Sequence, residues 1–68
     1  MKIDIFIERF NENKSVELKE NSRVKDLLRE LDISSNTVLV TVNNNLVVDT
    51  TALNDNDQVK LLSVVSGG

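Results

Sequence analysis

Hydrophobic and polar residues alternate along the first part of the chain. Between Lys2 and Phe10, isoleucine occupies three consecutive odd positions, and mostly polar residues stand between them. A period of two is typical of a strand with one buried face. The alternation resumes in segment 16–19, after the polar segment 11–13, where asparagine adopts positive φ at low cost. The pattern predicts an antiparallel hairpin whose buried face carries Ile3, Ile5 and Ile7.

A helical period follows in segment 24–31. Its apolar residues recur at intervals of three and four, so they form one stripe, while charged residues occupy the other side. Ser22, or alternatively Asn21, is the predicted N-cap. A helix of about ten residues is marginal alone in water, so we expect the stripe to pack on the isoleucine face of the hairpin. The stripe consists of Val24, Leu27, Leu28 and Leu31.

Two apolar segments after the polar link 34–36 predict a second pair of strands. Segment 38–42 alternates, with three valines on one face and Leu39 and Thr41 on the other. Three consecutive asparagines at 43–45 predict a turn, which leads into the short apolar segment 46–48.

Segment 49–57 is polar apart from Ala52 and Leu53, which predicts a loop that holds one helical turn anchored by Leu53. Residues 59–65 are the predicted last strand. The segregated apolar faces indicate an α+β fold, in which the helix lets the first and last strands pair in parallel at the sheet centre. We expect a β-grasp arrangement with a mixed sheet of four to five strands and one helix across one face.

Composition restricts the function of this 68-residue chain. A chain of this length forms one domain and buries only about 60% of the surface that its unfolded form exposes. It contains neither cysteine nor histidine, which excludes disulfides, thiolate nucleophiles and the usual zinc ligands. We therefore do not expect the chain to be an enzyme.

Charge and hydropathy restrict the partners further. The 8 basic and 11 acidic residues give a net charge of −3, which argues against nucleic-acid binding. No apolar run approaches the roughly 18 residues of a membrane span, and residues 1–4 do not begin a signal peptide. We expect a cytoplasmic monomer.

Glycine occurs only at Gly67 and Gly68, whereas the turns use asparagine. At a usage of about 7%, this terminal pair arises by chance roughly once in 200 chains. A frayed end or a cloning remnant is the alternative explanation. As a functional element, the flexible tail 66–68 extends about 10 Å, and residues without Cβ atoms thread a narrow channel. Its useful group is the carboxylate of Gly68, which becomes a good acyl donor once MgATP converts it to an acyl-adenylate.

The predicted order of elements, together with segments 53–61 and 64–68, resembles the ubiquitin-like sulfur carriers and small archaeal modifiers. This group includes the sulfur carrier of thiamine synthesis and the small subunit of molybdopterin synthase. Many members have Gly-Asp before the last strand, where this chain has Asn56 and Asp57. Asparagine is an acceptable substitute for glycine at such a turn.

The resemblance implies that partner proteins carry out the chemistry. A ubiquitin-activating-like enzyme would use MgATP to adenylate Gly68, and a thiocarboxylate or a thioester would follow. The chain itself would bind no cofactor. The activated end would serve a sulfur-acceptor synthase (thiamine, molybdopterin or tRNA thiolation) or form an isopeptide bond with a target lysine. A non-covalent β-grasp interaction module is the alternative function.

Strand alternation also predicts a docking surface. If the isoleucine and valine faces pack on the helix, four large apolar residues face solvent, and they would bind the activating enzyme beside the tail. Isolated exposed apolar residues are the alternative, since apolar atoms form over half of a normal surface. The four residues are Phe6, Leu39, Leu62 and Val64.

The acidic residues Asp49, Asp55 and Asp57 lack the glycine and the distal glutamate of a calcium loop. We therefore expect no metal site there, only turn formation with solvated carboxylates. Five lysines could accept modifier chains, although solubility explains them equally well. They are Lys2, Lys14, Lys19, Lys25 and Lys60.

Overall fold

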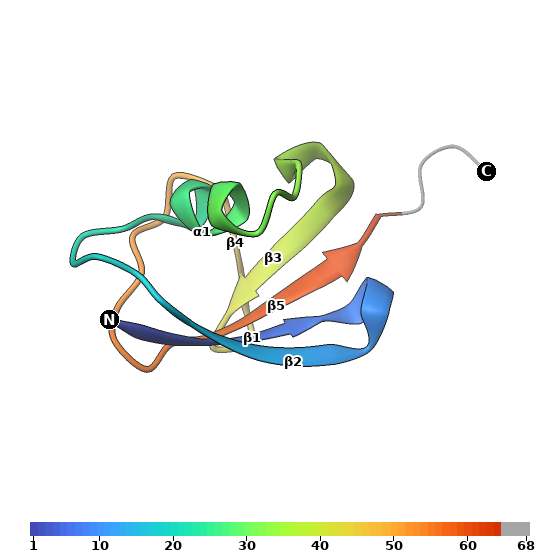
Figure 1. Ribbon diagram of the computed structural model, residues 1–68. Helices are drawn as coiled ribbons and strands as arrows, with labels where there is room; N and C mark the ends of the chain where they lie inside the picture. Colours follow the sequence, from blue (N-terminus) through green and yellow to red (C-terminus); the bar gives the residue numbers. More distant parts are fainter. Residues whose placement is uncertain (65–68) are drawn as a thin grey trace.

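The computed structural model describes residues 1–64 of the chain. Within these residues, five strands form one mixed sheet, and a single α-helix covers one of its faces (Figure 1). The predicted α+β fold and its β-grasp arrangement are confirmed. The elements are β1 (Lys2–Ile7), η1 (Glu8–Phe10), β2 (Glu12–Glu17), α1 (Val24–Glu30), η2 (Ser35–Thr37), β3 (Val38–Val42), β4 (Asn45–Val47) and β5 (Gln58–Ser63), where η denotes a 3₁₀ turn.

The first and last strands pair in parallel at the centre of the sheet, as predicted. The strand order is β2-β1-β5-β3-β4, and every other pairing is antiparallel. In the central pair, Ile5 lies opposite Val59 and Ile7 lies opposite Leu61. A parallel pair requires a long connection, and the segment that contains α1 forms part of it. This pairing brings residues from the two ends of the chain side by side.

The predicted core is confirmed with two exceptions. The alternating residues of β1, β3 and β5 and the stripe of α1 are buried against each other, but Val38 and Leu31 are only partly buried. Leu53 is buried as predicted, although its loop contains no helical turn within the described residues. The core consists of Ile3, Ile5, Ile7, Val24, Leu27, Leu28, Val40, Val42, Leu53, Val59 and Leu61.

The first hairpin turns earlier than the alternation predicted. β1 ends at Ile7 rather than at Phe10, and η1 fills the connection. Asn11 then takes the left-handed conformation with φ of 48°, and its N–H donates to the carbonyl of Glu8 at 3.0 Å. A short loop closed by this hydrogen bond lets β2 begin at Glu12, inside the segment predicted to be the turn.

The predicted N-cap of α1 is also wrong. Asn21 has a φ of 68°, and the Ser22 hydroxyl donates to the carbonyl of Lys19, so neither residue caps the helix. Arg23 occupies the N-cap position instead, and its backbone N–H donates to the carboxylate of Asp26 at 2.8 Å. This contact supplies half of a capping box, in which a side chain three residues on satisfies the N-cap amide.

The helix is shorter than predicted because a Schellman motif ends it. Ile33 donates its N–H to the carbonyl of Leu28 at 2.9 Å, and Asp32 donates to the carbonyl of Arg29 at 3.1 Å. Asp32 has a φ of 56°, in the position that glycine usually occupies in this motif. The α-helix therefore spans 7 residues.

Strands β4 and β5 also differ from their predicted bounds. Asn43 and Asn44 both have positive φ (51° and 71°), which forms a two-residue hairpin turn and leaves Asn45 to begin β4. β5 runs from Gln58 to Ser63 rather than over 59–65, and residue 65 lies outside the described residues.

Asp57 corrects the expectation that the acidic residues are solvated. Its side chain is only 7% exposed and accepts hydrogen bonds from the Asn43 amide at 3.0 Å and the Asn54 N–H at 2.8 Å. Asn56 has a φ of 67°, which explains why glycine is favoured here and why asparagine replaces it. Asp57 therefore joins the loop before β5 to the β3-β4 turn.

We predict that Asp57→Ala lowers the free energy of unfolding by about 1–3 kcal/mol, because it removes a buried acceptor from two donors. Asp49→Ala is the matched control, because that side chain is exposed; its change should stay within about 0.5 kcal/mol. Urea denaturation followed by circular dichroism measures both. Equal stability of the two variants would contradict the structural role of Asp57.

Candidate functional site

The chain leaves the sheet between η1 and η2, where β5 ends (Figure 1). Ser63 donates its N–H to the Oε1 of Glu8 at 3.1 Å, and Val64 donates its N–H to the carbonyl of Thr37 at 3.1 Å. These two hydrogen bonds hold the last described residues from both sides. We call residues 63–64 the tail root.

The predicted activated residues, Gly67 and Gly68, lie outside the described residues. By chain length alone, the four residues after Val64 can span at most about 13 Å, at roughly 3.3 Å each. The described residues therefore fix where the tail starts, and Gly68 can lie at most that far from Val64.

The four residues predicted to face solvent lie on strands or strand ends, on the face opposite α1. Leu39 of β3 pairs directly with Leu62 of β5, and Val64 follows two positions further along the same strand direction. Leu39 is 49% exposed and Val64 is 40% exposed, whereas Phe6 and Leu62 are half-buried. We call these four residues the apolar face. It overlaps the tail root at Val64.

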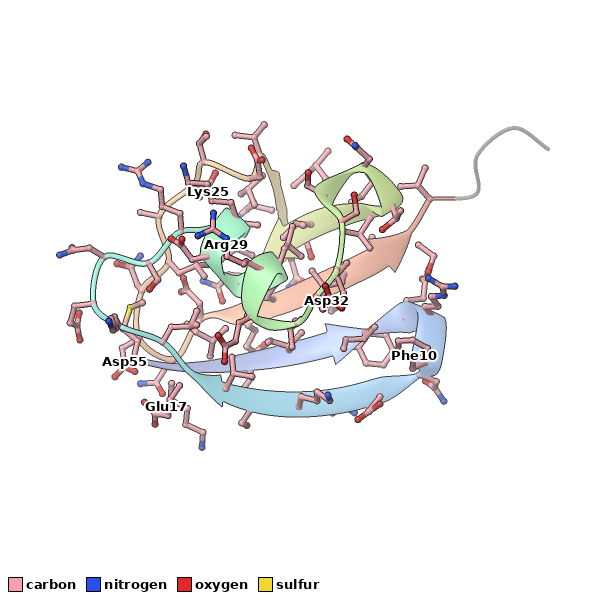
Figure 2. All side chains as sticks on the ribbon, turned by 45° about the horizontal axis from the view of Figure 1, so that its top comes forward. Phe10, Glu17, Lys25, Arg29, Asp32 and Asp55 are labelled. Atoms are coloured by element: carbon pink, nitrogen blue, oxygen red, sulfur yellow. The ribbon has the colours of Figure 1, made fainter. Side chains whose placement is uncertain are left out.

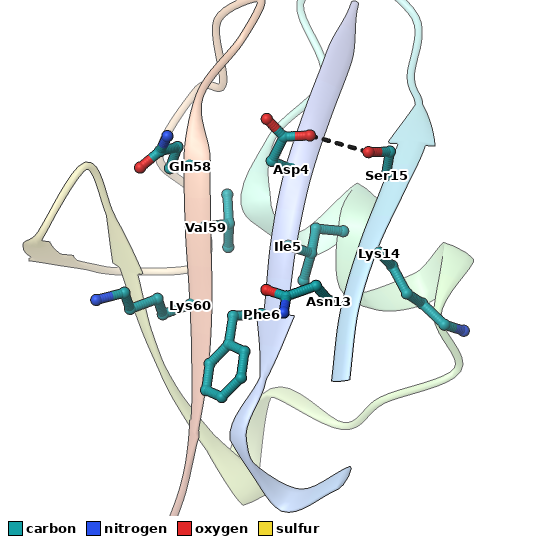
Figure 3. Close-up of a pocket in the computed structure, with 9 residues that line it drawn as sticks. All are labelled: Asp4, Ile5, Phe6, Asn13, Lys14, Ser15, Gln58, Val59 and Lys60. Atoms are coloured by element: carbon teal, nitrogen blue, oxygen red, sulfur yellow. Dashed lines mark hydrogen bonds between the residues drawn. The ribbon is translucent and has the colours of Figure 1, made fainter. Parts of the chain in front are cut away.

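On β1, β2 and the start of β5, the rest of this side of the sheet is polar, whereas the exposed Leu46 of the edge strand β4 also faces this side, opposite Thr41. Figure 3 shows the shallow depression there, with Asp4 of β1, Ser15 of β2 and Gln58 of β5 at one end and the Phe6 ring at the other. The Ser15 hydroxyl donates to Asp4 Oδ1 at 2.9 Å. Lys60 extends away from Phe6 and donates to the Asn44 side chain at 3.4 Å. Apolar character is therefore concentrated toward the tail root.

Sequence reasoning missed the exposed aromatic residue of η1. Phe10 is 62% exposed, and the Arg9 guanidinium carbon lies 5.7 Å from the centre of its ring. Figure 2 shows Phe10 at the same end of the molecule as the tail root. Its position in the sequence favoured a strand, and only the early turn at Asn11 places it beside the end of β5.

Among residues 1–64, no three histidine, cysteine or acidic side chains come together as metal ligands. The Asp55 carboxylate accepts a hydrogen bond from the Lys2 N–H at 2.7 Å, which gives it a turn-forming role. In the same residues, no helix is long and apolar enough to cross a bilayer. The features that remain for function are the tail root and the apolar face.

Comparison with known families covers nearly the whole chain, including the two glycines. The model of the ThiS family matches residues 5–68. The chain belongs to the ThiS family. The resemblance to ubiquitin-like sulfur carriers and small modifiers is thereby confirmed.

Solved structures share the fold over the full length of both chains. The ThiS thiamine biosynthesis protein of Geobacter metallireducens is 25% identical, with a TM-score of 0.71. SAMP1 of Haloferax volcanii is 17% identical, with a TM-score of 0.80. A chain from the complex of subunits 1 and 2 of the molybdopterin-converting factor of Helicobacter pylori is 22% identical, with a TM-score of 0.74. Coverage is 100% of both chains in all three cases.

Two adjacent leucines test which face of β5 belongs to the core. Leu61 is fully buried, whereas Leu62 is half-buried on the opposite face. We predict that Leu61→Ala lowers the free energy of unfolding by about 2–5 kcal/mol. Leu62→Ala should cost less than about 1.5 kcal/mol, because its face is not packed under α1. Thermal and urea denaturation measure the free energy of unfolding of both variants. A larger loss of stability in Leu62→Ala than in Leu61→Ala would contradict the assignment of Leu61 to the core face.

Proposed function

We propose that this ThiS-family protein carries a reactive acyl group at its C-terminal glycine. In the first step, a carboxylate oxygen of Gly68 attacks the α-phosphorus of MgATP in an activating enzyme. The bond to the β-phosphoryl oxygen breaks, pyrophosphate leaves, and an acyl-adenylate remains. The observation that carries this proposal is the family match, which extends through Gly67 and Gly68.

In the second step, a sulfur nucleophile of the partner attacks the acyl carbon, and AMP leaves. A persulfide nucleophile, followed by thiol reduction of its S–S bond, yields a thiocarboxylate, whereas a plain enzyme thiol yields a thioester. The first product donates sulfur to a synthase, and the second is transferred to a lysine amine with formation of an isopeptide bond. Relatives named for thiamine biosynthesis and for molybdopterin conversion favour sulfur transfer.

The apolar face supplies the dock for the activating enzyme. Leu39, Leu62 and Val64 gather next to the tail root, and Phe6 lies on the same side of the sheet. Burial of such residues gives affinity while the tail reaches the active site. The polar end of this side, around Asp4 and Gln58, would then form the rim of the interface.

The decisive experiment combines the chain, its cognate activating enzyme and MgATP. We expect pyrophosphate release and an intact mass increased by one adenylyl group. Protein isolated from its native cells should show replacement of one oxygen by sulfur, or linkage to a target lysine. If neither adenylate nor adduct forms, the chain is a non-covalent interaction module instead.

Removal of Gly67 and Gly68 should abolish adenylation while leaving the fold intact, because both residues lie beyond the last strand. Pyrophosphate release and circular dichroism measure the two properties. Pyrophosphate release that persists in the shortened chain would contradict the assignment of Gly68.

Leu62→Asp should raise the KM of the activating enzyme for this protein by about tenfold or more, because binding would remove water from the new carboxylate on the apolar face. Leu46→Asp is the matched control: it is an exposed leucine of the edge strand β4, outside the apolar face. Both variants should keep the native circular dichroism spectrum. An unchanged KM for Leu62→Asp, or equal effects of both variants, would refute this dock.

A further inference from the structure

Strand β1 is too short to pair with the end of β5. Their shared register ends where Ile7 lies opposite Leu61, and the chain then turns into η1 at Glu8. Successive N–H groups of a strand point to alternate sides, so the N–H of Ser63 points toward the place that a longer β1 would occupy. This N–H needs an acceptor that no strand provides.

The carboxylate of Glu8 supplies the hydrogen-bond acceptor that a longer β1 would have provided. Its Oε1 accepts the Ser63 N–H at 3.1 Å, from a residue that is 55 positions away in the sequence. Hydrogen bonds to an ionised acceptor are roughly twice as strong as neutral ones. Glu8 therefore extends the hydrogen-bonded edge of the sheet to the tail root.

The opposite side of the tail root is held by backbone atoms. Val64 donates to the carbonyl of Thr37 at 3.1 Å, which continues the ladder between β3 and β5 by one residue. Thr37 is itself fixed in η2, because its hydroxyl donates to the carbonyl of Ser34 at 2.8 Å. Of the two contacts on the tail root, only that of Glu8 comes from a side chain, so only Glu8 can be tested by substitution of its acceptor.

We propose that Glu8 is a positioning residue that sets the direction in which the tail leaves the sheet. This inference rests on the proposed function. Without the acceptor, Ser63 and Val64 are held on the β3 side alone, so the activating enzyme must select the bound conformation of the tail root from a larger ensemble. The loss of free energy therefore affects binding of the tail to the activating enzyme. The chemical step is unchanged, because the bound tail has the same geometry in the variant as in the wild type.

The side chain of Glu8 lies outside the hydrophobic core. It is exposed, and the η1 turn that contains it has no buried residue. A loss of tail binding in a variant that stays folded at the assay temperature therefore separates positioning from a merely structural role.

The test compares Glu8→Ala with Glu8→Gln, whose amide oxygen keeps the acceptor but removes the charge. Glu20→Ala is the control, since this exposed glutamate belongs to the connection between β2 and α1. That connection lies at the opposite end of the molecule from the end of β5 (Figure 1). Pyrophosphate release with the cognate activating enzyme and MgATP gives KM and kcat. Amide hydrogen exchange of Ser63 reports the contact directly.

We expect Glu8→Ala to raise the KM of the activating enzyme for this protein roughly 3- to 10-fold, which is the equivalent of one lost hydrogen bond. The kcat should stay within roughly twofold of the wild-type value. The Ser63 amide of Glu8→Ala should exchange faster by a factor similar to that in KM. Glu8→Gln should fall between Glu8→Ala and the wild type in both properties, because its neutral acceptor makes a weaker hydrogen bond, and Glu20→Ala should match the wild type. The melting temperature of Glu8→Ala should fall by no more than about 10 °C, the equivalent of one hydrogen bond in a chain of this size, so that all four proteins stay folded at the assay temperature.

Several results would overturn the inference: an unchanged KM in Glu8→Ala, unfolding of Glu8→Ala at the assay temperature, or a Glu8→Gln variant as impaired as Glu8→Ala. If the wild-type protein forms no adenylate, the proposed function fails instead. In that case unchanged exchange of Ser63 in Glu8→Ala overturns the contact, whereas faster exchange shows that Glu8 holds the tail root.

Discussion

The parallel pairing of β1 with β5 is the constraint on which the rest of the structure depends. It places the first and last strands side by side at the centre of the sheet and sets one register, with Ile5 opposite Val59. In this register both strands bury the same face under α1. A slip of one residue in either strand would turn its buried residues toward solvent and its outward residues toward the helix, so burial of the core specifies the register strongly.

The same pairing decides where function can reside. Because β1 stops at Ile7, the end of β5 projects beyond its central neighbour and takes its remaining hydrogen bonds from Glu8 and Thr37. The apolar face lies at this end, on the side that α1 leaves uncovered. In the proposed function, this end of the sheet serves as the platform beside the terminal acyl group, and every bond-making residue belongs to the partners.

The distribution of asparagine and glycine follows one physical rule. Six described residues have positive φ, and all are asparagine or aspartate, the side chains that tolerate this conformation best after glycine. A residue with a side chain also loses less backbone freedom on folding than glycine does. The turns are thus built without glycine, which remains only at positions 67 and 68.

The sequence alone determined the faces of the strands, the stripe of α1 and the asparagine turns, because each depends on a backbone period or on a single residue's φ. It also placed Phe6, Leu39, Leu62 and Val64 on one side of the sheet. Only the tertiary structure decided that β1 ends at Ile7, that Asp57 is buried and that Glu8 holds Ser63. These features depend on hydrogen bonds between residues as far as 55 positions apart, which no local pattern encodes.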